Sequence, residues 1–123
     1  MRKNGLQEVV VRGEGGRIVC ERCEVADTAV ARARGLLGRK ELPAGEGILI
    51  RPGFSIHTFF MRFPIDAVFL DRSGLVVDVV GRLKPWRTAT RLGTRAVLEL
   101  AAGEAERLTL RAGERLEPVE AAA

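Results

Sequence analysis

The segment Phe54–Asp66 holds the side chains best suited to chemistry in this sequence of 123 residues. The only histidine of the chain, His57, lies there with four of the five phenylalanines and one of the two methionines. An imidazole next to a carboxylate can act as a general acid and base, or it can hold a ligand by hydrogen bonds. Asp66 and Glu99 are the carboxylates that we select as partners, so the catalytic candidates are His57, Asp66 and Glu99.

His57 has three interpretations. An extended strand over Ser55–Phe63, with apolar residues on both faces, would bury His57 as a neutral ring bonded to the backbone or to a carboxylate. We favour this structural interpretation over a His57 that binds a ligand, or acts as a base, at the mouth of a pocket. A soft-metal site formed with Met61 lacks a third ligand, and we therefore predict no metal site.

The two carboxylates also have structural interpretations. Asp66 follows Pro64, and a proline ends a strand, so Asp66 is placed to cap a corner of the sheet by accepting backbone N–H groups. We favour that role for Asp66 over catalysis. Glu99 alternates with apolar residues in Val97–Leu100, which predicts a partly buried carboxylate that needs a partner.

Trp86, the only tryptophan, lies with Arg87 in a basic stretch without acidic residues. An indole flanked by cations can bind a sugar, a base or a peptide, or it can close the end of a barrel. We expect the stretch to be mainly a solvated loop, and binding of nucleic acid through it is a weaker alternative. Its basic residues are Arg82, Lys84, Arg87, Arg91 and Arg95.

Cys20 and Cys23 form a single C-x-x-C pair within a predicted strand. Two cysteines and one histidine are too few for a zinc site, and side chains three residues apart on a regular strand point to opposite faces. We therefore predict neither a redox nor a metal role for the pair. The sequence has no P-loop and no Rossmann glycine pattern, and we predict no cofactor.

The elements that must position these residues are predominantly strands. Short apolar runs alternate with turns, and the clearest hairpin flanks Arg72–Gly74. One helix is expected at about 28–37, with Asp27 as its N-cap and Gly38 just beyond its end. The pattern predicts a mainly β fold, a β-sandwich or small jelly-roll-like barrel with this one short α-helix. The predicted strands are 8–12, 17–26, 47–51, 55–63, 65–71, 75–83, 95–100, 107–111 and 114–119.

Composition places the chain among ordinary globular proteins. Hydrophobic residues make up 46% and charged residues 29%, with a formal net charge of +4. These values argue against disorder, and no apolar run is long enough to cross a membrane. We expect one domain over 1–123, frayed at 1–5 and 120–123, and a cytoplasmic location because no signal peptide precedes the first strand.

The order of several motifs resembles the family named domain of unknown function 192 (DUF192) over about 19–119. The family implies a small, mostly β, jelly-roll-like domain and has no established activity. The resemblance draws attention to the following residues without giving them roles: Arg34, Gly35, His57, Phe60, Met61, Pro64, Asp66 and Glu99. The matching motifs are Ala26–Thr28, Arg34–Arg39, Leu42–Pro43, Gly45–Gly47, His57–Met61, Pro64–Asp66, Phe69–Asp71, Gly74 and Val97–Leu100.

The sequence favours a binding domain over an enzyme. The expected pocket is lined by His57, Phe60, Met61 and Asp66, with Trp86 and Arg87 at its rim, and it would take a small anion, a saccharide or a peptide. The alternatives are a hydrolase or lyase that uses His57 with Asp66 or Glu99, and nucleic-acid binding through the basic loop. Neither the ligand nor the oligomeric state follows from the sequence.

Overall fold

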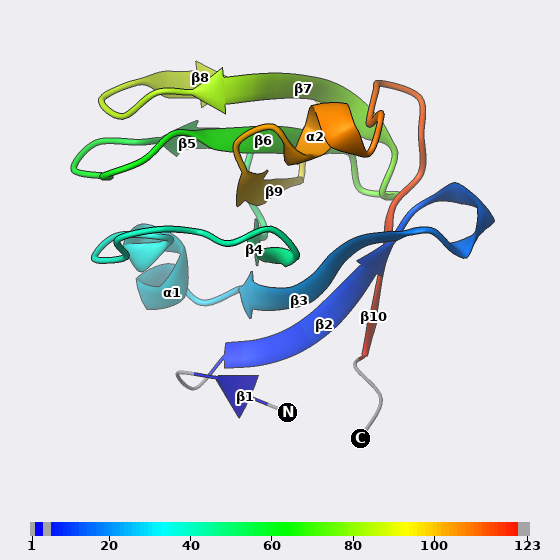
Figure 1. Cartoon of the computed structure of the whole chain (residues 1–123), viewed down its shortest axis with the longest axis horizontal. Coiled ribbons are helices and arrows are strands. Elements are labelled where there is room, and N and C mark those ends of the chain that lie inside the picture. The colour runs from blue at the N-terminus through cyan, green and yellow to red at the C-terminus, as the bar shows by residue number, and fades with distance from the viewer. Residues whose placement is uncertain (1, 4–5, 121–123) are drawn as a thin grey trace.

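The computed structural model describes residues 2–3 and 6–120 and is dominated by short strands (Figure 1). Its strands are β1 (Arg2–Lys3), β2 (Leu6–Arg12), β3 (Ile18–Ala26), β4 (Glu46–Ile50), β5 (Ser55–His57), β6 (Ile65–Leu70), β7 (Val76–Leu83), β8 (Thr88–Thr90), β9 (Ala96–Ala101) and β10 (Glu117–Glu120). Its helices are α1 (Ala29–Arg34), α2 (Glu104–Arg107) and a 3-10 turn at Glu14–Gly16.

One 8-stranded sheet carries most of the chain, in the order β1-β2-β3-β4-β9-β6-β7, with β10 also paired to β2. The β3–β4 pair is parallel and the other pairs of this sheet are antiparallel. Strands β5 and β8 form a separate 2-stranded ribbon. Within the described residues the sheet does not close into a barrel, because its ordered path ends at β1 and β7.

Alternating side chains divide the interior into two cores, one on each face of the sheet. On β9, Leu98 and Leu100 enter the core covered by α2, whereas Val97 enters the core covered by α1 and the β5–β8 ribbon. Strand β6 alternates in the same way, with Val68 on the first face and Phe69 on the second. This strict period of two fixes the face on which each functional side chain lies.

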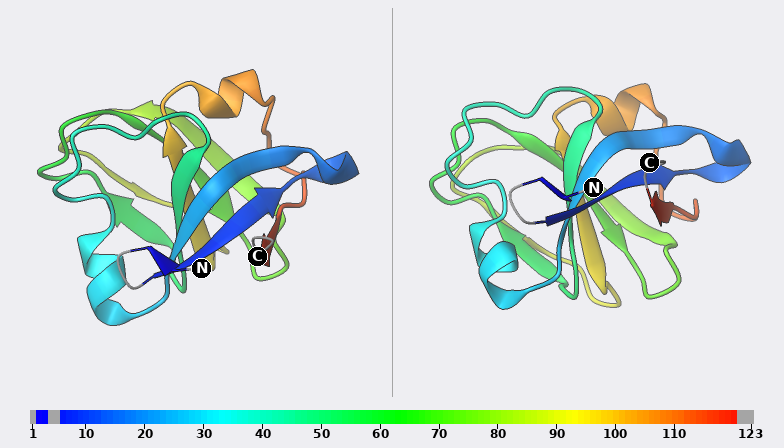
Figure 2. Two further views of the ribbon diagram at one scale, coloured as in Figure 1. Left: turned by 60° about the horizontal axis from the view of Figure 1, so that its bottom comes forward. Right: turned by 90° about the horizontal axis from the view of Figure 1, so that it is seen from below.

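The segment 114–120 connects the two ends of the curled sheet (Figure 2). The amide of Val76, at the start of β7, donates to the Glu114 carbonyl at 2.7 Å, and the Leu116 amide donates to the Gly74 carbonyl at 2.8 Å. The same segment then runs along β2 as β10. These bonds hold the sheet in its curved form over the fully buried Leu116.

The predicted mainly β class is confirmed, and so is the hairpin formed by β6 and β7 around Arg72–Gly74. The predicted helix is shorter at both ends. Thr28, rather than Asp27, caps α1 by accepting the Ala31 amide at 3.1 Å. Gly35 ends the helix with a φ of 46° instead of lying inside it.

Two predicted strands are wrong. Residues 55–63 are extended only as far as His57, because Thr58 turns the chain and Phe60 adopts a φ of 67°. Residues 107–111 form no strand, because α2 ends there in a turn in which the Leu110 amide donates to the Ala105 carbonyl.

The two cysteines lie on the same side of β3, contrary to prediction. Cys23 pairs with Val9 and Cys20 with Val11, so a step of three residues on β3 opposes a step of two on β2. This β-bulge rotates the strand and brings both thiols into one core. A hydrogen bond with Cys20 and burial raise the pKa of the Cys23 thiol.

The described helices include none that is long and apolar enough to cross a membrane. Parts of the ends that were predicted to fray lie in strands: residues 2–3 form β1, and Glu120 is the last residue of β10. The rest of those ends lies outside the described residues.

Candidate functional site

A small pocket lies between the C-terminal part of α1, strand β5 and the middle of β9. Its volume is about 170 Å³, and we call it the Glu99 pocket. Its walls include Arg34 and Gly35, His57 and Met61, and Glu99. These five residues come from three segments that are far apart in the sequence, and the fold alone brings them together.

Glu99 is the unusual member of this pocket. Its neighbours Leu98 and Leu100 face the other core, so the alternation of β9 turns the carboxyl towards the pocket. Only 3% of the residue is exposed, and its carboxyl makes no hydrogen bond or ion pair with any described residue. Burial raises its pKa from the ordinary 4.5 to about 8. The group is therefore a neutral carboxylic acid at neutral pH, and it is able to donate a hydrogen bond.

His57 is exposed, so the buried ring that the sequence favoured is wrong. Because β5 ends at His57, the residue lies at an edge of the two-stranded ribbon and not in a covered strand. Its Nδ1 accepts the Phe59 amide at 3.3 Å, and its ring stacks on that of Phe59 with centroids 5.1 Å apart. A neutral ring in this arrangement carries its proton on Nε2, the nitrogen left for a ligand.

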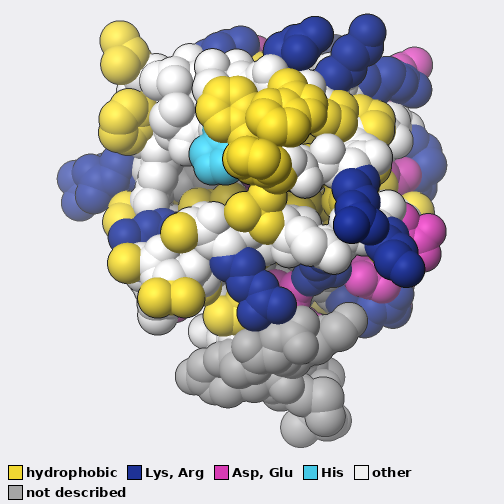
Figure 3. All heavy atoms as spheres, turned by 90° about the vertical axis from the view of Figure 1, so that its left-hand side faces the viewer, with side chains coloured by type: hydrophobic (Ala, Val, Ile, Leu, Met, Phe, Trp, Pro, Cys, Tyr) yellow, Lys and Arg dark blue, Asp and Glu magenta, His cyan; other side chains and the backbone are white. Residues whose placement is uncertain are grey.

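Three exposed aromatic side chains continue from His57 as a ridge made of Phe59, Phe60 and Trp86. The Phe60 and Trp86 ring centroids are 4.7 Å apart, and those of Phe59 and Trp86 are 5.9 Å apart. Figure 3 shows this apolar band next to the histidine on one face of the molecule. Trp86 is 56% exposed and so does not plug the end of a barrel.

The ridge includes two backbone positions that bulky residues rarely adopt. Phe60 has a φ of 67° and Trp86 has a φ of 66°. Such left-handed conformations cost on the order of 1–2 kcal/mol each outside glycine. The surrounding structure must hold both aromatic residues in these conformations, and strained residues of this kind concentrate at binding sites.

Thr58 is the residue that holds them. It is fully buried, and its carbonyl accepts the amides of Met61 and Trp86 at 3.2 and 3.0 Å. Its hydroxyl donates to the Lys84 carbonyl at 2.6 Å and accepts the Arg87 amide at 2.9 Å. One side chain and its own backbone thus fasten the 58–61 turn to the 84–87 loop. The sequence analysis did not select Thr58, because nothing in its type or spacing reveals a buried link between two loops.

Asp66 lies on the opposite face of the sheet from the Glu99 pocket. Its two carboxylate oxygens accept the backbone amides of Arg82 and Ala105, each at 2.8 Å, and only 1% of the residue is exposed. It therefore joins β6 to β7 and to α2. The structure separates Asp66 from both His57 and Glu99, although the sequence analysis grouped all three.

The structure brings together only part of the predicted binding set. His57 and Met61 line the Glu99 pocket, while Phe60 and Trp86 form the adjacent ridge. The Arg87 side chain bonds to carbonyls of its own loop. Arg34 and Gly35, which the family resemblance emphasised, join the pocket wall.

The basic loop is partly neutralised. Arg82 pairs with Glu106 at 2.8 Å and Arg91 pairs with Asp78 at 2.6 Å. Neither carboxylate belongs to the loop itself, which is why the sequence showed only positive charge there.

In the described part of the chain, no group of three or more His, Cys, Asp or Glu side chains could hold a metal ion.

The fold and the pocket define a small, mainly β protein with an open, curled sheet and a small pocket next to an aromatic ridge. The model of the DUF192 family, described as an uncharacterized ACR, matches residues 9–118. The chain belongs to this family, as the resemblance predicted.

Curated relatives include several UPF0127 proteins. One from Pyrococcus horikoshii is 47% identical over 66 residues, which cover 51% of this chain and 56% of the relative. The match thus spans little more than half of that relative's length. Another, from Thermococcus sibiricus, is 32% identical over 107 residues, which cover 83% of this chain and 69% of the relative.

Solved structures share the fold. A protein of unknown function from Novosphingobium aromaticivorans has a TM-score of 0.81 and 30% identity, covering 95% of this chain and 89% of that one. A Sinorhizobium meliloti protein has a TM-score of 0.85 at 24% identity, covering 95% and 98% of the two chains. The second likeness concerns the fold alone.

Proposed function

We propose that the protein binds a small ligand, or the end of a larger one, through an acceptor group that enters the Glu99 pocket. The observation that carries this proposal is the buried Glu99 carboxyl, which faces a cavity and has no partner among the described residues. Buried polar groups are normally hydrogen-bonded, so a carboxyl left open to a pocket is suited to bind a ligand.

The chemistry of the pocket favours a carboxylate or another small anion. The protonated Glu99 carboxyl is a donor, Nε2 of His57 is the ring nitrogen left for a ligand, and the wall includes Arg34, a cation. A volume of about 170 Å³ holds only a few non-hydrogen atoms, so the remainder of the ligand would lie outside. The adjacent ridge of Phe59, Phe60 and Trp86 offers it a flat apolar surface.

Glu99→Leu tests this proposal, because it separates binding from stability. Replacing an unpartnered buried carboxyl by an apolar side chain should raise the Tm, whereas binding should be lost. We expect thermal-shift and NMR titrations with small carboxylates, monosaccharides and short peptides to find a ligand for the wild type. Glu99→Leu should lose it and Trp86→Ala should weaken it.

Glu41→Leu and Leu92→Ala are the matched controls, because both positions are exposed and outside the pocket. They should retain full affinity. Ligands that bind Glu99→Leu and Trp86→Ala as tightly as the wild type would contradict the proposal.

A hydrolase or lyase is the second candidate, favoured by the presence of His57 and Glu99 in one pocket. With a pKa of about 8, Glu99 becomes a general base only as it ionises, so activity should rise with pH through about 8. Chromogenic esters and glycosides provide the assay. A rate that is the same for wild type and Glu99→Gln would exclude this candidate.

A further inference from the structure

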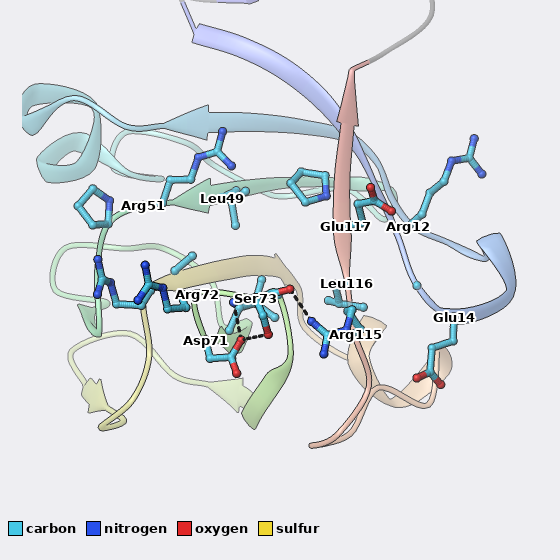
Figure 4. Close-up of a pocket in the computed structure, with 17 residues that line it drawn as sticks. Arg12, Glu14, Leu49, Arg51, Asp71, Arg72, Ser73, Arg115, Leu116 and Glu117 are labelled. Atoms are coloured by element: carbon cyan, nitrogen blue, oxygen red, sulfur yellow. Dashed lines mark hydrogen bonds between the residues drawn. The ribbon is translucent and has the colours of Figure 1, made fainter.

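A second, larger cleft lies on the other side of Pro52 from the Glu99 pocket. Its volume is about 1060 Å³ (Figure 4). The end of β4, the β6–β7 turn, the start of β9 and residues 115–118 line it, and Pro52 contributes to the walls of both cavities. Arg95, the last residue of the basic stretch between Arg82 and Arg95, is among the lining residues.

Three arginines from three segments line the cleft, namely Arg51 after β4, Arg72 in the β6–β7 turn and Arg95 before β9. Figure 4 shows Arg51 and Arg72 on the same side of it. The backbone holds these segments together. The Gly53 amide donates to the Arg95 carbonyl at 2.9 Å, and the Arg95 amide donates to the Leu70 carbonyl at 2.8 Å. The three side chains are thus presented at neighbouring points of one rim.

None of these three guanidinium groups forms an ion pair with a carboxylate of residues 2–3 or 6–120. The same holds for Arg12 and Arg115, which also line the cleft and donate to backbone carbonyls. Six other arginines do pair with carboxylates, namely Arg17, Arg22, Arg39, Arg82, Arg91 and Arg107. Asp71, the carboxylate closest in sequence to Arg72, instead accepts the Ser73 and Leu75 amides and the Ser73 hydroxyl. The cationic end is therefore left for an external anion.

The opposite end of the cleft has a different character. Figure 4 shows Glu14 and Glu117 there, away from Arg51 and Arg72. Arg12 and Arg115 lie on this side too, so its two carboxylates are balanced by two guanidinium groups and the excess positive charge of the cleft lies with Arg51, Arg72 and Arg95. This distribution suits a ligand with its negative charge at one end. The wall between the two ends includes apolar side chains, Leu49 and Leu70 among them.

We propose that this cleft binds a small phosphorylated molecule, a phosphate or pyrophosphate ester, with its phosphate held by Arg51, Arg72 and Arg95. Guanidinium groups bind phosphate oxygens in a bidentate manner and keep their charge at every accessible pH. The neutral part of the ligand lies along the apolar wall, and any hydroxyl or amino groups point towards Glu14 and Glu117. This site is separate from the Glu99 pocket and does not depend on the function proposed for it.

Isothermal titration of the full chain with inorganic pyrophosphate and with inorganic phosphate, at fixed ionic strength, tests the proposal. We expect pyrophosphate to bind more tightly than sulfate at equal concentration. The variant Arg51→Gln/Arg72→Gln/Arg95→Gln should lose at least about tenfold in affinity. The variant Glu99→Leu should bind pyrophosphate like the wild type, which keeps this test distinct from that of the Glu99 pocket.

The matched control is Arg62→Gln/Arg87→Gln/Arg111→Gln, which removes the same charge from exposed arginines outside the cleft. It should stay within about twofold of the wild type, because screening weakens distant charges. If the triple cleft variant does not fold, Arg72→Gln in the exposed turn replaces it, with a smaller expected loss. Equal losses in cleft and control variants, or no binding of pyrophosphate by the wild type, would overturn the proposal. Tighter binding of a single-stranded oligonucleotide than of pyrophosphate would also overturn it, in favour of nucleic acid.

Discussion

At Glu99, the residue type that would best stabilise the fold differs from the one that is present. The alternation of β9 requires a residue on the pocket face between Val97 and Ala101, and an apolar side chain there would simply extend the second core. A carboxyl without a partner costs free energy in that position. The presence of an acid at such a place is better explained by a ligand than by stability.

The pH dependence of stability follows from the same group. The unfolded carboxyl titrates near pH 4.5 and the folded one near pH 8, so between these values the folded state holds one extra proton. The contribution of Glu99 to stability is therefore present at low pH. It falls by about 1.4 kcal/mol for each pH unit as the pH rises towards 8.

Urea unfolding of the wild type and of Glu99→Gln at several pH values measures this contribution as a difference. The wild type should lose stability relative to the variant as the pH rises from 5 to 8, and the difference should then level off. The other ionisable groups that line the pocket, Arg32, Arg34 and His57, are present in both proteins and cancel in the comparison. Parallel pH profiles would show that the Glu99 pKa is not raised.

At the scale of elements, the function of the ridge depends on how two loops are joined. Thr58→Val keeps the shape of the buried side chain but removes the hydroxyl that links Lys84 and Arg87. The Arg87 amide would lose an acceptor, and we expect the free energy of unfolding to fall by about 1–3 kcal/mol. Denaturation followed by the fluorescence of Trp86, the only tryptophan, measures the loss and reports on the ridge itself.

Thr90→Val is the control, because the Thr90 hydroxyl bonds only to the exposed Ser55 hydroxyl. Its effect should stay within about 0.5 kcal/mol. If both variants lose the same stability, Thr58 is not the link between the loops.

Elements also show where sequence patterns succeed and where they fail. Turn chemistry is local, so the Arg72–Gly74 hairpin was predictable from its residues alone. The alternation of side chains along a strand correctly predicts that Glu99 faces the interior. It wrongly predicts opposite faces for the two cysteines, because the bulge in β3 depends on how β2 pairs with it. The same alternation predicts one strand over Ser55–Phe63. The strand in fact ends before Thr58, because Thr58 bonds to a loop some 26 residues away.

At the scale of the whole molecule, the candidate site is formed by segments distant in sequence, and no local sequence pattern predicts their contacts. The sequence selected His57, Met61 and Glu99, which do meet in one pocket. It grouped Asp66 with them because the two residues His57 and Asp66 are close in sequence. Their separation follows from the sheet, since Asp66 on β6 is opposite Leu100 on β9 and therefore faces the other core.

The join between the two ends of the sheet can be tested at Gly74. This residue has a φ of 89°, and a Cβ there would collide with the carbonyl oxygen of Leu116. Gly113 has a φ of 98° but open space around its position for a Cβ. Gly113→Ala should therefore cost only the backbone strain, on the order of 1–2 kcal/mol. Gly74→Ala should cost clearly more, because it also displaces residues 114–116 from the start of β7.

Urea unfolding gives the two losses, and hydrogen exchange locates them. In Gly74→Ala the amides of Val76 and Leu116, which bond across the join, should exchange faster than in Gly113→Ala. Cys20 lies in the same core, and the amides around it should exchange faster only if the curvature of the sheet itself relaxes. Equal losses for the two alanine variants, with unchanged exchange at Val76 and Leu116, would mean that the 114–120 segment covers the curved sheet without holding it. A selective loss in Gly74→Ala would establish that the curve depends on this segment, and with it the cleft that Arg72 and Leu116 line together.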